Sequence, residues 1–240
     1  MAYGKYKWRI AGFVFKAICI LLIALVVVLL LWRIIDSNND TRKMNTIIPN
    51  ERLVNAYQEK NGELDIFTQE HTIFTRGDKN YGYFAITQSA IISDIDQIQL
   101  VFRYNNSTLK HTATDYKLEE VPSRDDEVYD VTLIIMYDLT PQNADDNDGK
   151  TPGTVKYERV FSSLSLSDQK TLYNYRKFVF DGIVIDDSVI AVYADFYYVG
   201  DIDYDEKPYG SLLVYHNTAE KIKCKLSSDD VSAIESFSEN

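Results

Sequence analysis

The chain is poor in the residues that dominate cross-linked, fibrous or low-complexity proteins. Its 240 residues include only two cysteines, five prolines, ten glycines and three histidines. Two cysteines cannot build a disulfide framework, and so little glycine and proline excludes collagen-like and low-complexity chains. Basic residues are outnumbered by acidic ones, 25 to 36. The formal net charge of −11 argues against a nucleic-acid-binding protein, because phosphates would be repelled.

The remaining composition is that of a folded protein whose two parts face different solvents. Hydrophobic residues make up 45% and charged residues 25% of the chain, enough apolar material for one sizeable core. The length allows one domain, or at most two small ones. Residues 1–35 contain basic side chains and no acidic one, whereas the remainder is strongly acidic. A basic, apolar N-terminal segment joined to an acidic remainder suggests that one part lies in lipid and the other in water.

A long apolar run lies near the N-terminus. Residues 17–32 read AICILLIALVVVLLLW and contain no charge. Extending the run back to Ile10 includes only one charged residue, Lys16, which can reach toward the headgroups. As a helix, residues 10–32 would span roughly 34 Å, enough for a hydrocarbon core of about 30 Å. Trp8 and Trp32 flank the run, as interfacial anchors do.

We expect residues 10–35 to be an uncleaved transmembrane signal anchor in a lipid bilayer. Lys5, Lys7 and Arg9 precede the run without an acidic residue, which favours a cytoplasmic N-terminus and an extracytoplasmic C-terminal domain. A cleaved signal peptide is the main alternative, but WRIID follows the run where cleavage requires small residues. A buried helix of a soluble domain fits less well, because no polar stripe interrupts the run.

The rest of the chain divides into a linker, a domain and a tail. Residues 1–9 form the predicted cytoplasmic tail and residues 36–61 a polar juxtamembrane linker. The linker contains ERLVNAYQEK, a short helix for which Asn50 is the expected cap. Residues 227–240 are a C-terminal tail, where Ser228 or Asp229 could cap a helical turn or two.

Strand patterns dominate residues 62–226. Ile98, Leu100, Phe102 and Tyr104 alternate with polar residues, as in a half-buried strand. Residues 129–139 are apolar on both faces, and residues 188–199 are rich in β-branched and aromatic side chains. No regular alternation of strands and helices is present. The sequence therefore predicts a mainly β fold, with a single antiparallel β-sandwich that is immunoglobulin-like or jelly-roll-like.

Catalytic motifs are few. The sequence contains no HExxH, GxSxG, P-loop or GxGxxG pattern, and the histidines lack metal-ligand spacing. One S-x-x-K occurs, from Ser167 to Lys170, but the other elements of penicillin-recognising enzymes are missing, so a polar turn is expected. Asn105 begins an N-N-S-T stretch that also reads as a polar turn or, in a eukaryote, a glycosylation site. We expect no enzymatic activity.

Two acidic clusters are candidate Ca²⁺ sites. Closely spaced carboxylates on loops offer the oxygen ligands that Ca²⁺ requires, although neither cluster follows the EF-hand pattern. A solvated acidic loop is the simpler interpretation of both. The candidate ligands are Asp145, Asp146, Asp148, Asp201, Asp203 and Asp205.

Tyrosine is abundant, with 18 residues, and suits recognition surfaces because it combines an apolar ring with a polar tip. Tyr193 and Tyr197 are expected on the polar face of their strand, with Tyr204 and Tyr209 nearby. They are candidates for an aromatic patch that binds sugar or peptide. The alternative is sheet packing, since tyrosine favours strands.

Three stretches, read together with the anchor, resemble single-pass envelope proteins of Gram-positive, Clostridia-type bacteria, for which no activity is known. The stretches are TIIPNERLVNAYQEK, DQIQLVFRYNNSTLKH and YDVTLIIMYDLTP. The resemblance implies an extracytoplasmic bacterial protein and assigns no functional residue.

The expected function is a structural or protein-interaction role in the cell envelope, performed by a membrane-anchored β-sandwich. The alternative is a Ca²⁺- or carbohydrate-binding module tethered to the membrane. The expected partners are the lipid bilayer, through residues 10–35, and an envelope protein or polysaccharide. No cofactor is expected beyond the candidate Ca²⁺.

Overall fold

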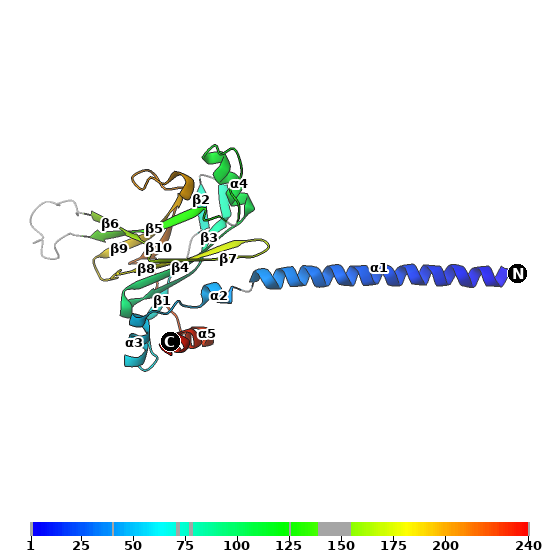
Figure 1. Cartoon of the computed structure of the whole chain (residues 1–240), viewed down its shortest axis with the longest axis horizontal. Helices are drawn as coiled ribbons and strands as arrows, with labels where there is room; N and C mark the ends of the chain where they lie inside the picture. Colours follow the sequence, from blue (N-terminus) through cyan, green and yellow to red (C-terminus); the bar gives the residue numbers. More distant parts are fainter. Residues whose placement is uncertain are drawn as a thin grey trace, which may run out of the picture. The chain divides into compact units, whose positions relative to one another are not determined.

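A computed structural model describes residues 2–39, 41–70, 73–76, 79–124, 126–138 and 155–239. The chain divides into two compact units, Met1–Thr41 and Arg42–Asn240. The first contains α1 and the second contains every other described element (Figure 1).

The first unit is a single long helix, α1 (Ala2–Asn39). Its segment Phe13–Asp36 has a mean hydropathy of 3.2 over its most apolar window, and none of that window is buried. Its 24 residues would extend about 36 Å, which exceeds the roughly 30 Å of a bilayer core. The helix is therefore long and apolar enough to cross a membrane, as the sequence predicts. A signal sequence would meet the same criterion.

The second unit is built on two antiparallel sheets, which confirms the predicted mainly β fold. Among the described residues, sheet A has the strand order β11-β1-β3-β4-β8-β7, with β2 also paired to β3, and sheet B has the order β10-β9-β5-β6. The strands of sheet A are β1 (Ile66–Thr68), β2 (Ile73–Arg76), β3 (Lys79–Ile92), β4 (Gln97–Tyr104), β7 (Leu164–Gln169), β8 (Asn174–Asp181) and β11 (Ile222–Lys223). Those of sheet B are β5 (Tyr129–Asp138), β6 (Val155–Phe161), β9 (Val189–Tyr198) and β10 (Gly210–His216).

The main core lies between the two sheets. Phe102 of β4 contacts Phe178 of β8 and Phe196 of β9, with ring centroids 5.6 and 4.7 Å apart. Leu100 and Leu133, from opposite sheets, are fully buried in the same cluster. Burying each such side chain contributes about 1.5–3 kcal/mol, so this layer is the main source of stability. The predicted alternation along residues 98–104 is confirmed, because all four apolar residues face this core.

The outer face of sheet A is covered by the segment that follows the first unit. We call residues 42–50 the strap; they include α2 (Arg42–Asn45). The main chain of Ile48 forms two hydrogen bonds of 2.9 Å with the side-chain amide of Gln99 on β4. Lys177 Nζ on β8 donates to the Thr46 carbonyl at 2.5 Å. Residues 42–50, which belong to the expected juxtamembrane linker, thus pack on central strands of sheet A.

Two helices extend this covering layer, α3 (Glu51–Glu59) and α5 (Ser228–Ser238), which lie next to each other (Figure 1). As predicted, Asn50 caps α3 by accepting from the Leu53 amide at 2.8 Å. The cap of α5 is Ser227, not Ser228 or Asp229, because Asp230 reaches back to the Ser227 amide in a capping box. Asp230 also accepts from the Ile47 amide at 2.6 Å, joining α5 to the strap.

One helix replaces a predicted turn. Residues 105–108 were expected to form a polar turn, but they begin α4 (Asn106–Asp115). Asn105 accepts from the amides of Ser107 and Thr108, while the Thr108 hydroxyl accepts from the Asn105 amide. This capping box starts the helix, and Leu109 then anchors it in the main core. The remaining short helices are η1 (Ser93–Ile95) and η2 (Val199–Asp201).

Lys177 makes the strap contact sensitive to pH. Its side chain is among the largest fully buried ones, and the residue is 2% exposed. Burial lowers the pKa of Lys177 from 10.5 to about 8, and the charge of Asp230 partly opposes that shift. Between these two pKa values the unfolded chain binds more protons than the folded one, so stability rises with pH across this range.

We predict that replacing Lys177 with methionine removes this pH dependence. The unfolding free energy of the full chain in detergent, measured at pH 7.5 and 9.5, should increase with pH more in the native chain than in Lys177→Met. The difference arises because only the native chain discharges a buried ammonium over this interval. Equal pH slopes in the two chains would show that Lys177 is not buried in its charged form.

Candidate functional site

Those proposed Ca²⁺ ligands that lie within the described residues do not converge on one point. Asp145, Asp146 and Asp148 lie outside the described residues. Asp201, Asp203 and Asp205 are exposed in and after η2, and Asp203 accepts from the Asp205 amide at 2.9 Å. Within the described part of the chain, no group of three or more His, Cys, Asp or Glu residues is placed to hold a metal. The Ca²⁺ site remains a prediction.

Tyr193 and Tyr197 lie on the outer face of sheet B, but Tyr197 is only 3% exposed. Its ring packs edge-on against Tyr204, with the ring centroids 5.0 Å apart, and its hydroxyl accepts a 3.4 Å hydrogen bond from Arg159 Nη2. The Tyr204 hydroxyl donates to Asp130 at 2.5 Å. Burial and this carboxylate raise the pKa of Tyr204 to about 12. These groups fasten the loop after β9 onto the sheet.

Tyr209 does not join that cluster. It faces the main core, where its ring lies 5.7 Å from that of Tyr129. The four tyrosines singled out in the sequence therefore divide between two faces of sheet B. The face of Tyr197 is covered, so the rings open to a ligand on this side are instead those of Tyr157 and Phe161 on β6.

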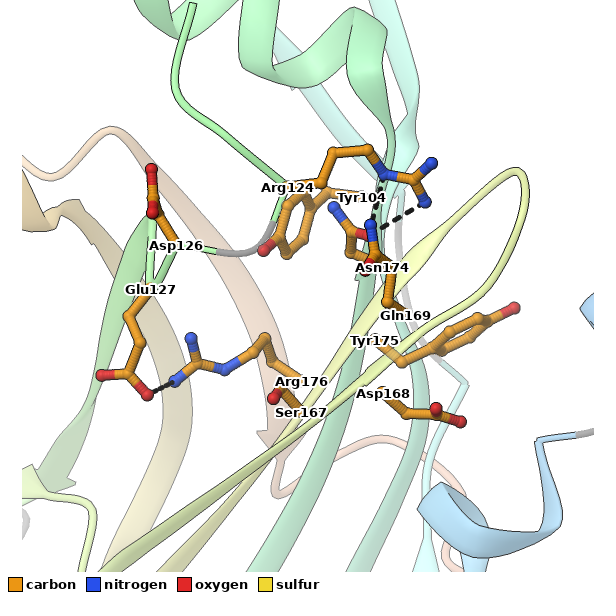
Figure 2. A pocket seen from close by; sticks show the side chains of 10 residues that line it. All are labelled: Tyr104, Arg124, Asp126, Glu127, Ser167, Asp168, Gln169, Asn174, Tyr175 and Arg176. Atoms are coloured by element: carbon orange, nitrogen blue, oxygen red, sulfur yellow. Dashed lines mark hydrogen bonds and ion pairs between the residues drawn. The ribbon is translucent and has the colours of Figure 1, made fainter.

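A polar pocket of about 150 Å³ lies at one end of the sandwich, beside β7 (Figure 2). Its walls come from β4, the segment before β5, β7 and β8, which are far apart in the sequence. Tyr175 and Asp168 point away from Arg176, toward the other face of sheet A (Figure 2). The lining residues are Tyr104, Arg124, Asp126, Glu127, Ser167, Asp168, Gln169, Asn174, Tyr175 and Arg176.

Arg124 closes one side of the pocket by clamping the β7–β8 turn. Its Nε and Nη2 donate to Asn174 Oδ1 at 3.1 and 3.0 Å. Nη1 donates to the Thr171 carbonyl at 3.1 Å, and Nη2 also donates to the Lys170 carbonyl. One planar guanidinium thus joins the segment before β5 to the end of sheet A.

Arg176 forms the pocket floor and is 5% exposed. Its Nη2 donates to Glu127 at 3.1 Å and to the Ser165 hydroxyl at 3.3 Å, and its guanidinium lies 5.3 Å from the ring of Phe178. Arg176 Nε has no hydrogen-bond acceptor among the described residues. Burial raises the pKa of nearby Tyr104 and the Arg176 charge partly lowers it, so Tyr104 stays neutral near pH 7. The pocket therefore offers donors and exposed carboxylates to a polar group.

The Ser167–Lys170 region is a strand end, not the predicted turn. Ser167 belongs to β7, and Lys170 forms an ion pair of 3.1 Å with Asp168. The sequence missed β7 because LSLSDQ carries only two apolar residues. The strand forms because its main chain pairs with β8 along its whole length.

Strands β6 and β7 form one continuous edge of the domain. We call residues 155–169 the edge ribbon; Ser162 and Ser163 alone separate its two strands. Among the described residues, β6 pairs only with β5, and β7 only with β8. The ribbon therefore passes from the edge of sheet B to the edge of sheet A. Its exposed apolar residues are Val155, Tyr157, Phe161, Leu164 and Leu166.

The hydrogen-bond direction along β7 follows from its turn. The Lys170 amide donates to the Tyr173 carbonyl at 2.8 Å, so the main-chain groups of Lys170 point toward β8. Antiparallel strands alternate residues that face the partner with residues that face away. The main chains of Ser165, Ser167 and Gln169 therefore point to the open edge. Native proteins usually block such edges, so an edge that no described strand pairs with indicates a place for strand pairing.

Comparison with protein-family models, with curated proteins and with solved structures finds no match for this chain. What the chain does is therefore inferred from its own residues and geometry.

We predict that Arg124→Ala loosens the β7–β8 turn. Because the guanidinium satisfies two carbonyls and an amide oxygen, its loss should lower the unfolding free energy by about 2 kcal/mol and speed amide exchange at residues 170–174. Arg124→Lys should restore little, since an ammonium lacks the planar fork.

The matched control for this prediction is Arg52→Ala. Arg52 is exposed and forms only a 3.7 Å ion pair with Asp96, so its loss should cost less than about 0.5 kcal/mol. Unchanged exchange at the turn in Arg124→Ala would contradict the proposed clamp.

Proposed function

We propose that the chain is a membrane-anchored, extracytoplasmic protein that binds an envelope protein by adding a strand of that protein to β7. The observation that carries the proposal is the outer edge of the edge ribbon, which no described strand pairs with and which lies beside a polar pocket. Strand addition uses main-chain hydrogen bonds for affinity and side-chain pockets for specificity. Both parts are present at β7.

Orientation is inferred from charge. Lys5, Lys7 and Arg9 precede the apolar helix with no acidic residue among them. Translocation machinery retains such segments on the cytoplasmic side. The acidic second unit, beginning at Arg42, would then lie outside the cytoplasm.

The pocket would determine which side chain of the added strand fits beside β7. Side chains of Ser165 and Ser167 face the inner side of sheet A, where Arg176 lies opposite Ser167 on β8. In an added strand, alternate side chains would point to this same side. One of them would project over Ser167 into the pocket, toward Arg176. A polar side chain able to accept hydrogen bonds suits that position.

We predict that protease added to intact cells or spheroplasts degrades the second unit. This follows if residues after about 36 are extracytoplasmic, since the domain would be accessible without permeabilisation. Immunoblotting with an antibody to the C-terminal helix, before and after lysis, measures it. A domain spared in intact cells and lost only after lysis would contradict the orientation.

We further predict that a photo-crosslinking amino acid at Leu166, in the full chain in cells, forms discrete adducts on irradiation. The same group at Val121, an exposed loop residue distant from the ribbon in sequence, is the matched control. Adducts should be several-fold stronger at Leu166, because an added strand lies about 4.8 Å from β7.

Two substitutions separate strand pairing from general contact. Ser167→Pro removes an outward amide, whereas Ser167→Ala keeps it, so only the proline variant should lose the Leu166 adducts. Both variants should remain folded, because Ser167→Ala keeps the amide and the amide lost in Ser167→Pro is not hydrogen-bonded to β8. Equal adducts at Leu166 and Val121, or adducts unchanged by Ser167→Pro, would contradict strand addition.

A further inference from the structure

No described strand pairs with the outer edge of β6, where a definite set of main-chain groups points outward. The Val199 amide donates to the Val128 carbonyl at 3.0 Å, so the main-chain amide and carbonyl of Val128 point toward β9. Because this direction alternates along β5, the main-chain groups of Leu133 and Ile135 point toward β6. Their partners on β6 are the even-numbered Val160 and Glu158, whose main chains therefore face β5. The odd-numbered residues of β6 face the open edge.

The outward-facing main chains are those of Val155, Tyr157 and Arg159. Their side chains lie on the outer face of sheet B, and Tyr157 is 63% exposed. Lys156 and Glu158 lie on the other face, 3.3 Å apart in an ion pair, and both are about half exposed. The strand thus carries a basic residue and an acidic residue on either side of an exposed tyrosine.

We propose that two copies of this chain pair through β6 in antiparallel fashion, centred on Tyr157. In this register Lys156 of each copy lies opposite Glu158 of the second copy, and the two Tyr157 rings are neighbours. Val155 lies opposite Arg159. Outward main-chain groups meet outward groups throughout, so the two four-stranded sheets become one continuous sheet.

Neighbouring registers are disfavoured by charge. A shift by one residue would bring outward groups against groups already bonded to β5. A shift by two residues would place Lys156 opposite Lys156, or Glu158 opposite Glu158. Like charges directly opposite each other destabilise a strand pair, whereas opposite charges and aromatic pairs stabilise it. Charge complementarity therefore selects a second copy of this chain, in one register, as the occupant.

The apolar helix favours this association. Each cross-strand pair is individually weak, but two copies held in one bilayer meet at a high effective concentration. The proposal concerns β6 and is independent of partner binding at β7.

Disulfide trapping in membranes tests the register. The full chain carries Cys19→Ala and Cys224→Ala, and Tyr157→Cys is introduced. A hydrogen-bonded antiparallel pair has Cα atoms about 5.5 Å apart, within disulfide range, so oxidation should give a covalent dimer. Phe161→Cys is the matched control: it is exposed on the same strand, but its two copies would lie about 27 Å apart.

Charge reversal tests the complementarity. Lys156→Glu and Glu158→Lys, each expressed alone with Tyr157→Cys, place like charges opposite each other and should reduce the trapped dimer on the order of tenfold. Coexpression of the two reversed chains restores opposite charges between copies, so the mixed dimer should recover. The ion pair within each chain is not restored, which separates the two contacts.

The outcomes are distinct. Trapping at Tyr157 but not Phe161, with recovery on coexpression, supports the pairing. Equal trapping at both positions, or no recovery on coexpression, overturns it. Unchanged Leu166 adducts in the charge-reversed chains would show that β7 binding stands independently of this result.

Discussion

The hydrogen bonds between the strap and the buried polar side chains of sheet A are the constraint on which the domain depends. Gln99 and Lys177 lie on central strands, where an unpaired amide or ammonium would cost about 1–3 kcal/mol or more. The strap supplies their acceptors from its own main chain, at Ile48 and Thr46. Sheet A therefore has two covered faces, one packed on sheet B and one on the strap and helices.

That arrangement leaves one side of the sandwich open. Because the strap, α3 and α5 cover the outer face of sheet A, the exposed strand surface is concentrated along the edge ribbon. The ribbon changes sheets within two residues, so it offers two separate edges with different chemistry. The β7 edge lies beside a polar pocket, and the β6 edge carries a balanced pair of charges around Tyr157.

Local patterns in the sequence predicted the features that local forces determine. Asn50 was recognised as a cap, and the alternation at residues 98–104 identified a core strand. The same alternation places Gln99 on the polar face of that strand, whereas a segment some fifty residues earlier covers its side chain. Strand β7 was missed because an edge strand needs few apolar residues. The pocket could not be predicted, since Tyr104, Arg124 and Arg176 meet only in the folded sheets.

The strap also determines how the domain bears mechanical load. If α1 is held in a membrane, as proposed, tension on the domain would enter through residues 42–50, because they follow α1 in the chain. Peeling the strap away would remove the Ile48 and Thr46 carbonyls that accept from Gln99 and Lys177, and would break the Ile47–Asp230 contact to α5. Because the strap is hydrogen-bonded to the central strands β4 and β8, a force on it would be shared by several strands at once.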